Sequence, residues 1–224
     1  RRLLILTYVD DCYVQGPAES VEWFAAQLND RFMCKSTNYL THDNSVDFLG
    51  MLLKRGSESM YIDMSQYIEA MWINLKMAEA EQKLKLKREP ETPISNPIVP
   101  DSELTKEEAK WVLSALGSIG WLSMCSRPDL RYAHSRISQH LAKPTLAVMR
   151  AAIQAVRYAY YTKYLVIEQK YTQTQSEWRC YSDSDHAGNA EIQNKRRSQL
   201  AYVIMNGTAP ISWSSKASAV QLYD

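Results

Sequence analysis

An apolar run that ends on two adjacent carboxylates constrains this chain more than any other feature. Residues 3–9 form a short run rich in β-forming side chains, and Asp10 and Asp11 follow it at once. A second short apolar run covers residues 12–14, so the pattern predicts a β-hairpin with Asp10 and Asp11 at its two-residue tip. Aspartate suits such a turn because its short side chain can bond nearby backbone groups.

Two neighbouring carboxylates can also hold a divalent cation. Two like charges about 4 Å apart repel by roughly 4 kcal/mol at an effective dielectric constant of ~20, so an enclosed pair requires a cation. Mg²⁺ fits this role because it binds one or two carboxylates and keeps positions for water and phosphate oxygens. An ordinary Asp-Asp turn is the alternative that Asp10 and Asp11 alone leave open.

A second pair of carboxylates ends a later β pattern. Residues 178–182 are predicted to form a strand, which runs into Asp183 and Asp185. Residues i and i+2 of a strand share a face, so these two carboxylates can point at one volume and form a second divalent-metal site. A surface strand end is the alternative. His186 is not expected to be a ligand, because a magnesium site prefers oxygen.

The order of the predicted elements indicates an α+β protein. After the first hairpin we expect a helix over 21–32 with a core-facing apolar stripe, a strand over 46–53, a turn at Gly56-Ser57 and a partner strand over 60–62. A helix capped by Ser65 follows. Prolines and alternating Lys and Glu then predict a linker over 81–104.

An all-helical block is expected after this linker. Thr105 to Glu108 is a capping box before a long apolar helix, a second helix begins at Pro128 and is ended by Pro144, and a third follows. Its arginines either face phosphates or are solvated or ion-paired: Arg127, Arg131, Arg136, Arg150 and Arg157. Strands over 164–169, 178–182, 200–205 and 210–213 complete the pattern, with a turn at Asn206-Gly207.

Composition narrows the class further. A chain of 224 residues that is 46% hydrophobic and 23% charged is typical of globular domains. Its net charge of +1 does not indicate an overall basic surface. The four cysteines show no C-x-x-C spacing, which argues against zinc and fits a reducing, intracellular compartment. The chain opens inside a strand without Met and closes inside an element, so we expect a fragment of a longer polypeptide.

These segments, in order, resemble the C-terminal part of a copia-type (Ty1/copia) retrotransposon polyprotein. Tyr8-Val9-Asp10-Asp11 resembles the palm hairpin of its reverse transcriptase, and residues 46–50 and 60–68 resemble the strands and helix that follow. Residues 127–130, 135–138 and 143–145 resemble its helical thumb or connection. The start of its ribonuclease H domain is similar to residues 180–188, 194–202 and 211–216. The similarity covers nearly the whole chain.

The resemblance implies an order of domains. Residues 1–80 would be the C-terminal portion of the palm, with 81–104 as the charged, Pro-rich linker. Residues 105–170 would form the helical thumb or connection, and 171–224 the N-terminal part of an incomplete ribonuclease H-like α/β domain.

It also implies two-metal phosphoryl transfer. Asp10 and Asp11 would hold Mg²⁺ in the polymerase, and Asp183, with Asp185 beside it, would do so in the ribonuclease H. The implied partners are an RNA template, a DNA primer, their RNA/DNA hybrid and deoxynucleotide triphosphates. No membrane partner is expected, and the location would be cytoplasmic, particle-associated or nuclear.

The departures from the family pattern set the expected activity. In the family, an upstream palm strand supplies another Asp to the polymerase site. A helix after the third ribonuclease H strand carries a catalytic Glu, and residues 219–224 depart from that part of the pattern. Ala201 and His186 stand where Gly and Trp are usual. We therefore predict that the isolated chain has no polymerase activity. The alternatives are a non-catalytic nucleic-acid-binding or interaction remnant, and a ribonuclease H that works by itself.

Overall fold

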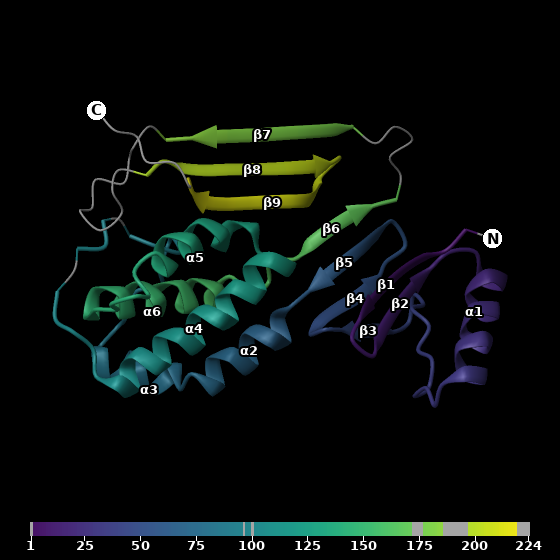
Figure 1. Ribbon diagram of the computed structural model, residues 1–224, viewed down its shortest axis with the longest axis horizontal. Coiled ribbons are helices and arrows are strands. Elements are labelled where there is room, and N and C mark those ends of the chain that lie inside the picture. The colour runs from purple at the N-terminus through teal and green to yellow at the C-terminus, as the bar shows by residue number, and fades with distance from the viewer. Residues whose placement is uncertain (1, 96, 100, 172–176, 186–196, 219–224) are drawn as a thin grey trace.

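In the computed structural model, one antiparallel sheet lies along a block of helices and two further antiparallel sheets lie at one end of it (Figure 1). The structure describes residues 2–95, 97–99, 101–171, 177–185 and 197–218. The sheets have two strands (β1-β2), four strands (β3-β4-β5-β6) and three strands (β7-β8-β9). This mixture of helices and strands confirms the predicted class. No helix in the described ranges is long and apolar enough to cross a membrane.

The N-terminal hairpin is followed by a helix that is only partly covered. Strands β1 (Leu4–Tyr8) and β2 (Asp11–Gln15) pair, and α1 (Ala18–Arg31) confirms the predicted helix. Ser20 is the residue of α1 that is buried, and Phe24 and Leu28 are half-buried. Phe32, just beyond the helix, is 64% exposed. The expectation that the whole apolar stripe faces the core is therefore wrong.

The four-stranded sheet joins segments that are far apart in the sequence. Its strands are β3 (Ser45–Phe48), β4 (Met51–Arg55), β5 (Ser59–Asp63) and β6 (Ile167–Lys170). The single strand predicted over 46–53 is two strands, because Leu49 and Gly50 have φ of +59° and +79° and reverse the chain. The turn at Gly56 is confirmed by its N–H, which donates to the Ser59 carbonyl at 2.8 Å.

Helix α2 (Ser65–Asn74) begins differently from the prediction. Met64 is its N-cap residue, and Ser65 does not cap it with its side chain. The Ser65 backbone N–H instead donates to Asp63 Oδ1 at 2.7 Å, and Lys54 Nζ lies 2.5 Å from Oδ2 of the same carboxylate. Burial alone would raise the pKa of Asp63, but these hydrogen bonds lower it below its usual value. Asp63, which lies before the helix, thus supplies the side-chain cap.

The segment predicted as a linker packs against the helical block. Its first residues belong to α3 (Met77–Leu84), and Ile94 and Ile98 are buried in the main core. The Arg88 carbonyl accepts from Arg157 Nη2 at 2.8 Å, which fastens the segment to α6. The proline-containing segment therefore runs along the helices and is not a loose spacer.

The helical block contains α4 (Lys106–Cys125), η1 (Pro128–Leu130), α5 (Arg131–Ser138) and α6 (Leu146–Tyr161). The predicted capping box is confirmed: Glu108 N–H donates to Thr105 Oγ1 at 3.2 Å, and Thr105 N–H donates to Glu108 Oε2 at 2.9 Å. Helix α5 ends at Ser138, before Pro144, so the proline does not end it as predicted.

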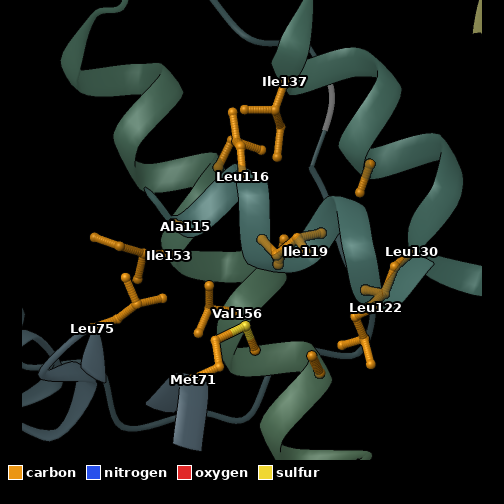
Figure 2. Packing of buried hydrophobic residues seen from close by; sticks show 14 of the residues in the cluster. Met71, Leu75, Ala115, Leu116, Ile119, Leu122, Leu130, Ile137, Ile153 and Val156 are labelled. Carbon is orange, nitrogen blue, oxygen red and sulfur yellow. The ribbon is translucent and has the colours of Figure 1, made fainter. Parts of the chain in front are cut away.

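The hydrophobic core sits between these helices and α2. Figure 2 shows Leu116 of α4 beside Ile137 of α5, and Leu122 of α4 beside Leu130. The same cluster contains Met71 from α2 and Val156 from α6. Burial of each such side chain stabilises the fold by roughly 1.5–3 kcal/mol, so this cluster is the main source of stability.

Replacing Gly120 by Ala is expected to destabilise the protein by about 1–3 kcal/mol. A Cβ there would lie 2.8 Å from Nε2 of His134, so α4 and α5 would have to separate or the ring would have to move. Gly117, on the same helix, is the matched control, because a Cβ there meets nothing within 4 Å. Gly117→Ala is expected to stabilise by about 0.5–1 kcal/mol. Equal urea midpoints for both variants would contradict this packing.

The three-stranded sheet docks on the helical block through polar contacts. Its strands β7 (Trp178–Ser184), β8 (Gln199–Asn206) and β9 (Ala209–Ala217) confirm the three predicted strands, and Gly207, with φ +60°, confirms the turn. Gln199 Nε2 donates to Ser135 Oγ of α5 at 2.9 Å, and Trp213 Nε1 donates to the Ser123 carbonyl of α4 at 2.7 Å. These bonds fix the side of the sheet that faces the helices.

Candidate functional site

The turn of the first hairpin differs by one residue from the prediction. Tyr8 pairs with Asp11, so the two-residue connection is Val9-Asp10 and Asp11 is the first residue of β2. The predicted tip, Asp10-Asp11, is therefore wrong. Val9 has φ +54°, a left-handed conformation that is rare for a β-branched residue, which is why the sequence favoured placing the turn on the aspartates.

Asp10 and Asp11 are exposed at the end of a hairpin that is itself largely exposed. Tyr13 connects the hairpin to the four-stranded sheet, with its ring 5.8 Å from that of Phe48. Burial there, with Tyr171 nearby, raises the pKa of Tyr13. Tyr13 thus connects the hairpin to the four-stranded sheet, and the end of the hairpin that carries the two carboxylates is exposed.

The second pair of carboxylates lies at the end of β7. Asp183 Oδ1 accepts from the Ser184 backbone N–H at 2.9 Å, and Asp185 Oδ1 accepts from the Gln199 N–H at 2.5 Å. Asp185 thereby ties the end of β7 to the start of β8. His186 lies outside the described residues.

The two pairs are separate in space. Figure 1 shows the β1-β2 hairpin and the C-terminal end of β7 apart along the long axis of the molecule. In the ranges that the structure describes, no three His, Cys, Asp or Glu side chains gather in a way that could hold a metal ion. Each pair therefore lacks a third carboxylate neighbour among these residues.

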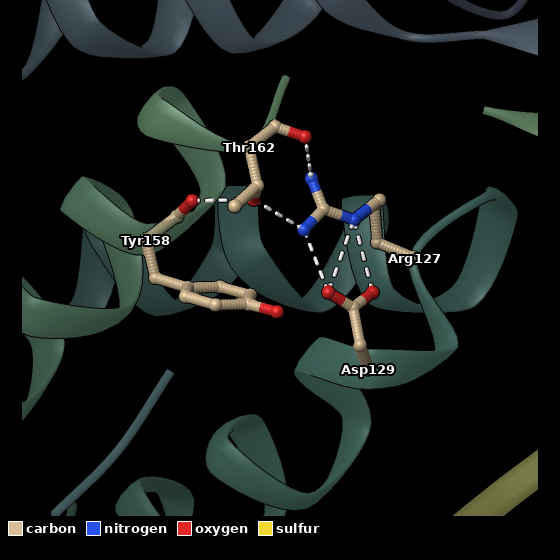
Figure 3. Close-up of polar contacts among 4 residues, drawn as sticks. All are labelled: Arg127, Asp129, Tyr158 and Thr162. Carbon is tan, nitrogen blue, oxygen red and sulfur yellow. Dashed lines mark hydrogen bonds and ion pairs between the residues drawn. The ribbon is translucent and has the colours of Figure 1, made fainter. Parts of the chain in front are cut away.

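Arg127 is a buried cation that the sequence did not distinguish from its neighbours. Its side chain is 2% exposed, and Figure 3 shows it between Asp129 and Thr162. Arg127 Nη2 lies 2.6 Å from Asp129 Oδ2, and Nη1 donates to the Thr162 carbonyl at 3.1 Å. The guanidinium carbon lies 5.7 Å from the centre of the Tyr158 ring. This residue joins the end of α4 to the end of α6.

Two further arginines of the block are also engaged within the chain. Arg157 Nε lies 2.5 Å from Glu81 Oε1, and both side chains are largely buried. Arg150 Nη1 lies 2.9 Å from Asp101 Oδ2 at the surface. The ion-paired alternative is thus confirmed for Arg127, Arg150 and Arg157, and these three do not form a patch directed at phosphates.

The chain has relatives among curated sequences, although no family model and no solved structure matches it. The retrovirus-related Pol polyprotein from transposon RE1 of Arabidopsis thaliana is 28% identical over 219 residues, which are 95% of this chain. The uncharacterized mitochondrial protein AtMg00810 of the same plant is 25% identical over 222 residues, 96% of this chain and 83% of that protein. The secreted RxLR effector protein 161 of Plasmopara viticola is 34% identical over 104 residues, 46% of this chain and 70% of that protein.

Four relatives that match 95–96% of the chain are named as transposon proteins. More particularly, three of them are named retrovirus-related Pol polyproteins from copia-type transposons, and the chain is 25–28% identical to these over about 96% of its length. The predicted resemblance is therefore confirmed. The chain spans 14% of the length of the RE1 polyprotein.

Proposed function

We propose that the chain is a segment of a retrotransposon RNA-directed DNA polymerase with ribonuclease H. The observation that carries the proposal is the position of Asp10 and Asp11 at an exposed hairpin turn, in a chain that matches 95% of its length to a Pol polyprotein. The intact polymerase would take an RNA template, a DNA primer and deoxynucleotide triphosphates.

Asp10 and Asp11 fit magnesium in their donor chemistry. Both are exposed carboxylates, Asp10 in the hairpin turn and Asp11 at the start of β2, and Mg²⁺ accepts such hard oxygen donors while keeping positions for water and phosphate oxygens. When bound, the cations would activate the primer hydroxyl and offset the charge on the departing pyrophosphate. Tyr8 pairs with Asp11 across the turn, which keeps the two carboxylates next to each other at the end of the hairpin.

Asp183 is the residue that we assign to the ribonuclease H metal site. It is an exposed carboxylate one residue before the end of β7, and its Oδ1 accepts from the Ser184 N–H, as Asp185 Oδ1 accepts from the Gln199 N–H. Asp185 would be the second ligand, and each carboxylate would bind through its other oxygen. The RNA strand of an RNA/DNA hybrid would be the substrate at this site.

The isolated chain is expected to show no Mg²⁺-dependent primer extension on an RNA template. Asp10 and Asp11 lack a third carboxylate neighbour among the described residues, and two exposed carboxylates alone bind Mg²⁺ weakly. The measurement is incorporation of labelled deoxynucleotide by the wild-type chain and by Asp10→Asn. Extension by the wild type that Asp10→Asn abolishes would overturn this expectation.

The same samples separate the other two readings of the chain. A salt-dependent mobility shift of an RNA/DNA hybrid without chemistry would support a non-catalytic nucleic-acid-binding remnant. Cleavage of the RNA strand that Asp183→Asn abolishes would support a ribonuclease H that works by itself. Asp30→Asn, which removes an exposed carboxylate of α1, is the matched control. It should change neither the mobility shift nor the cleavage.

A further inference from the structure

Gln199, the first residue of β8, is a buried side chain that joins the three-stranded sheet to the helical block. It is 8% exposed, although glutamine usually lies at the surface. Its Nε2 donates to Ser135 Oγ of α5 at 2.9 Å and to Ser215 Oγ of β9 at 2.8 Å. Its Oε1 accepts from Gln139 Nε2, at the C-terminal end of α5, at 3.3 Å. A buried amide needs such partners, so this side chain fixes the start of β8 against α5.

The backbone of the same residue holds the Asp185 carboxylate. The Gln199 N–H donates to Asp185 Oδ1 at 2.5 Å, and the Gln199 carbonyl accepts from the Asp185 N–H at 3.2 Å. Asp183 also lies against β8, since it pairs with Ala201, two residues beyond Gln199. The positions of both carboxylates therefore depend on where the start of β8 lies, and α5 contacts β8 at that point.

A second contact docks the sheet on the helices at a different point. Trp213 Nε1 of β9 donates to the Ser123 carbonyl of α4 at 2.7 Å, and Trp213 pairs with Val203, four residues beyond Gln199 in β8. This bond can hold the sheet on the helices without reaching the carboxylates. The bonds from Gln199 to α5 therefore have a separate consequence, which is the orientation of Asp185.

We propose that Gln199 is a positioning residue through which α5 controls the metal-site carboxylate Asp185. Two residues of α5 bond the Gln199 side chain, and the Gln199 N–H in turn bonds Asp185 Oδ1, which forms a continuous hydrogen-bonded path. Mg²⁺ requires near-ideal octahedral geometry, so displacing a ligand by about 0.5 Å weakens its binding. The metal part of the proposal rests on the proposed ribonuclease H site, whereas the path itself does not.

Amide hydrogen exchange of the full chain, followed by NMR, tests the path. Ser135→Ala removes one contact of α5 and is expected to raise the exchange rate of the Gln199 N–H at least about fivefold, because losing a hydrogen bond makes local opening easier. Ser135→Thr keeps the hydroxyl and should restore slow exchange. Ser138→Ala is the matched control on the same helix, since Ser138 is also half-buried and its Oγ lies 3.5 Å from His134 Nε2. It should change the exchange rate less than about twofold.

A second readout follows the carboxylates themselves. Mn²⁺ alone, which prefers carboxylate oxygen as Mg²⁺ does, should broaden the NMR signals of Asp183 and Asp185 in the wild-type chain. Gln199→Met, which keeps an unbranched side chain and removes its amide, is expected to raise the Mn²⁺ dissociation constant at this pair at least about tenfold. Trp213→Phe removes the other docking bond and should leave that constant within about twofold.

These outcomes separate the hydrogen-bonded path from the metal site. Equal Gln199 N–H exchange in Ser135→Ala and Ser138→Ala, or a Mn²⁺ dissociation constant that Gln199→Met leaves unchanged, would overturn the proposal. Faster exchange in Ser135→Ala together with no Mn²⁺ broadening in the wild-type chain would support the path from α5 to Asp185 and contradict the proposed metal site.

Discussion

Asp129→Asn is expected to lower the free energy of unfolding by about 3 kcal/mol, because it leaves the buried Arg127 cation without its counter-charge. Arg127 is 2% exposed, so water cannot replace the lost partner, whereas Asp129 is 32% exposed. That partial exposure places the expected loss at the lower end of the range for a broken buried pair. The Thr162 carbonyl and hydroxyl would keep their bonds to the guanidinium but carry no charge.

Urea denaturation at neutral pH measures this loss, with Asp101→Asn as the matched control. Asp101 pairs with Arg150, whose side chain is 61% exposed, so the control should cost at most about 1 kcal/mol. Arg127→Met combined with Asp129→Asn should recover part of the loss, because no charge is then stranded. If the two Asp→Asn variants proved equally stable, the buried pair would not be the stabilising contact that we describe.

Signals from neighbouring residues in the sequence were sufficient to predict much of this fold. The capping box at Thr105 and Glu108 needs two side chains three residues apart, and the Asn206-Gly207 turn needs a residue that accepts positive φ. Helix and strand periods predicted most of the other elements, but not α3 or the break between β3 and β4. Each of these signals acts over a few neighbouring residues, so no long-range contact had to be known.

The parts that were missed depend on contacts distant in sequence or on strained backbone. β6 pairs with β5 across the whole helical block, and no local pattern selects that partner. Val9 and Leu49 adopt positive φ without being Gly or Asn, so each turn fell outside the usual signals. Ile94 is buried because α6 and its neighbours cover it, although its own segment is polar and Pro-rich.

The candidate site shows the same division. Adjacency in the sequence brings Asp10 and Asp11 together at one end of the hairpin, and a strand period brings Asp183 and Asp185 to one strand end. The sequence did not show that Asp185 binds the Gln199 N–H, since that contact crosses a loop between two strands. Among the five arginines, only three-dimensional packing distinguishes the buried Arg127 from the exposed Arg150.

The roles proposed for Asp10 and Asp11 lead to a large expected effect in a whole polymerase. An active copia-type polymerase in which this chain replaces the matching segment is expected to retain Mg²⁺-dependent DNA synthesis on an RNA template. Asp10→Asn or Asp11→Asn should then lower kcat at least about 10²-fold. Loss of a metal ligand removes several kcal/mol of transition-state stabilisation, and each 1.36 kcal/mol is about tenfold in rate.

Two features make this test specific to the turn. Asp30→Asn removes an equally exposed carboxylate from α1 and should leave kcat within about twofold, since Asp30 lies in the helix that follows the hairpin. The Asp10 and Asp11 variants should still bind primer and template in a mobility assay, because the carboxylates act on the cation and not on the duplex. Synthesis that survives Asp11→Asn as well as it survives Asp30→Asn would refute the assignment. The assignment would also be refuted if the unsubstituted chimera bound primer and template normally but synthesised no DNA.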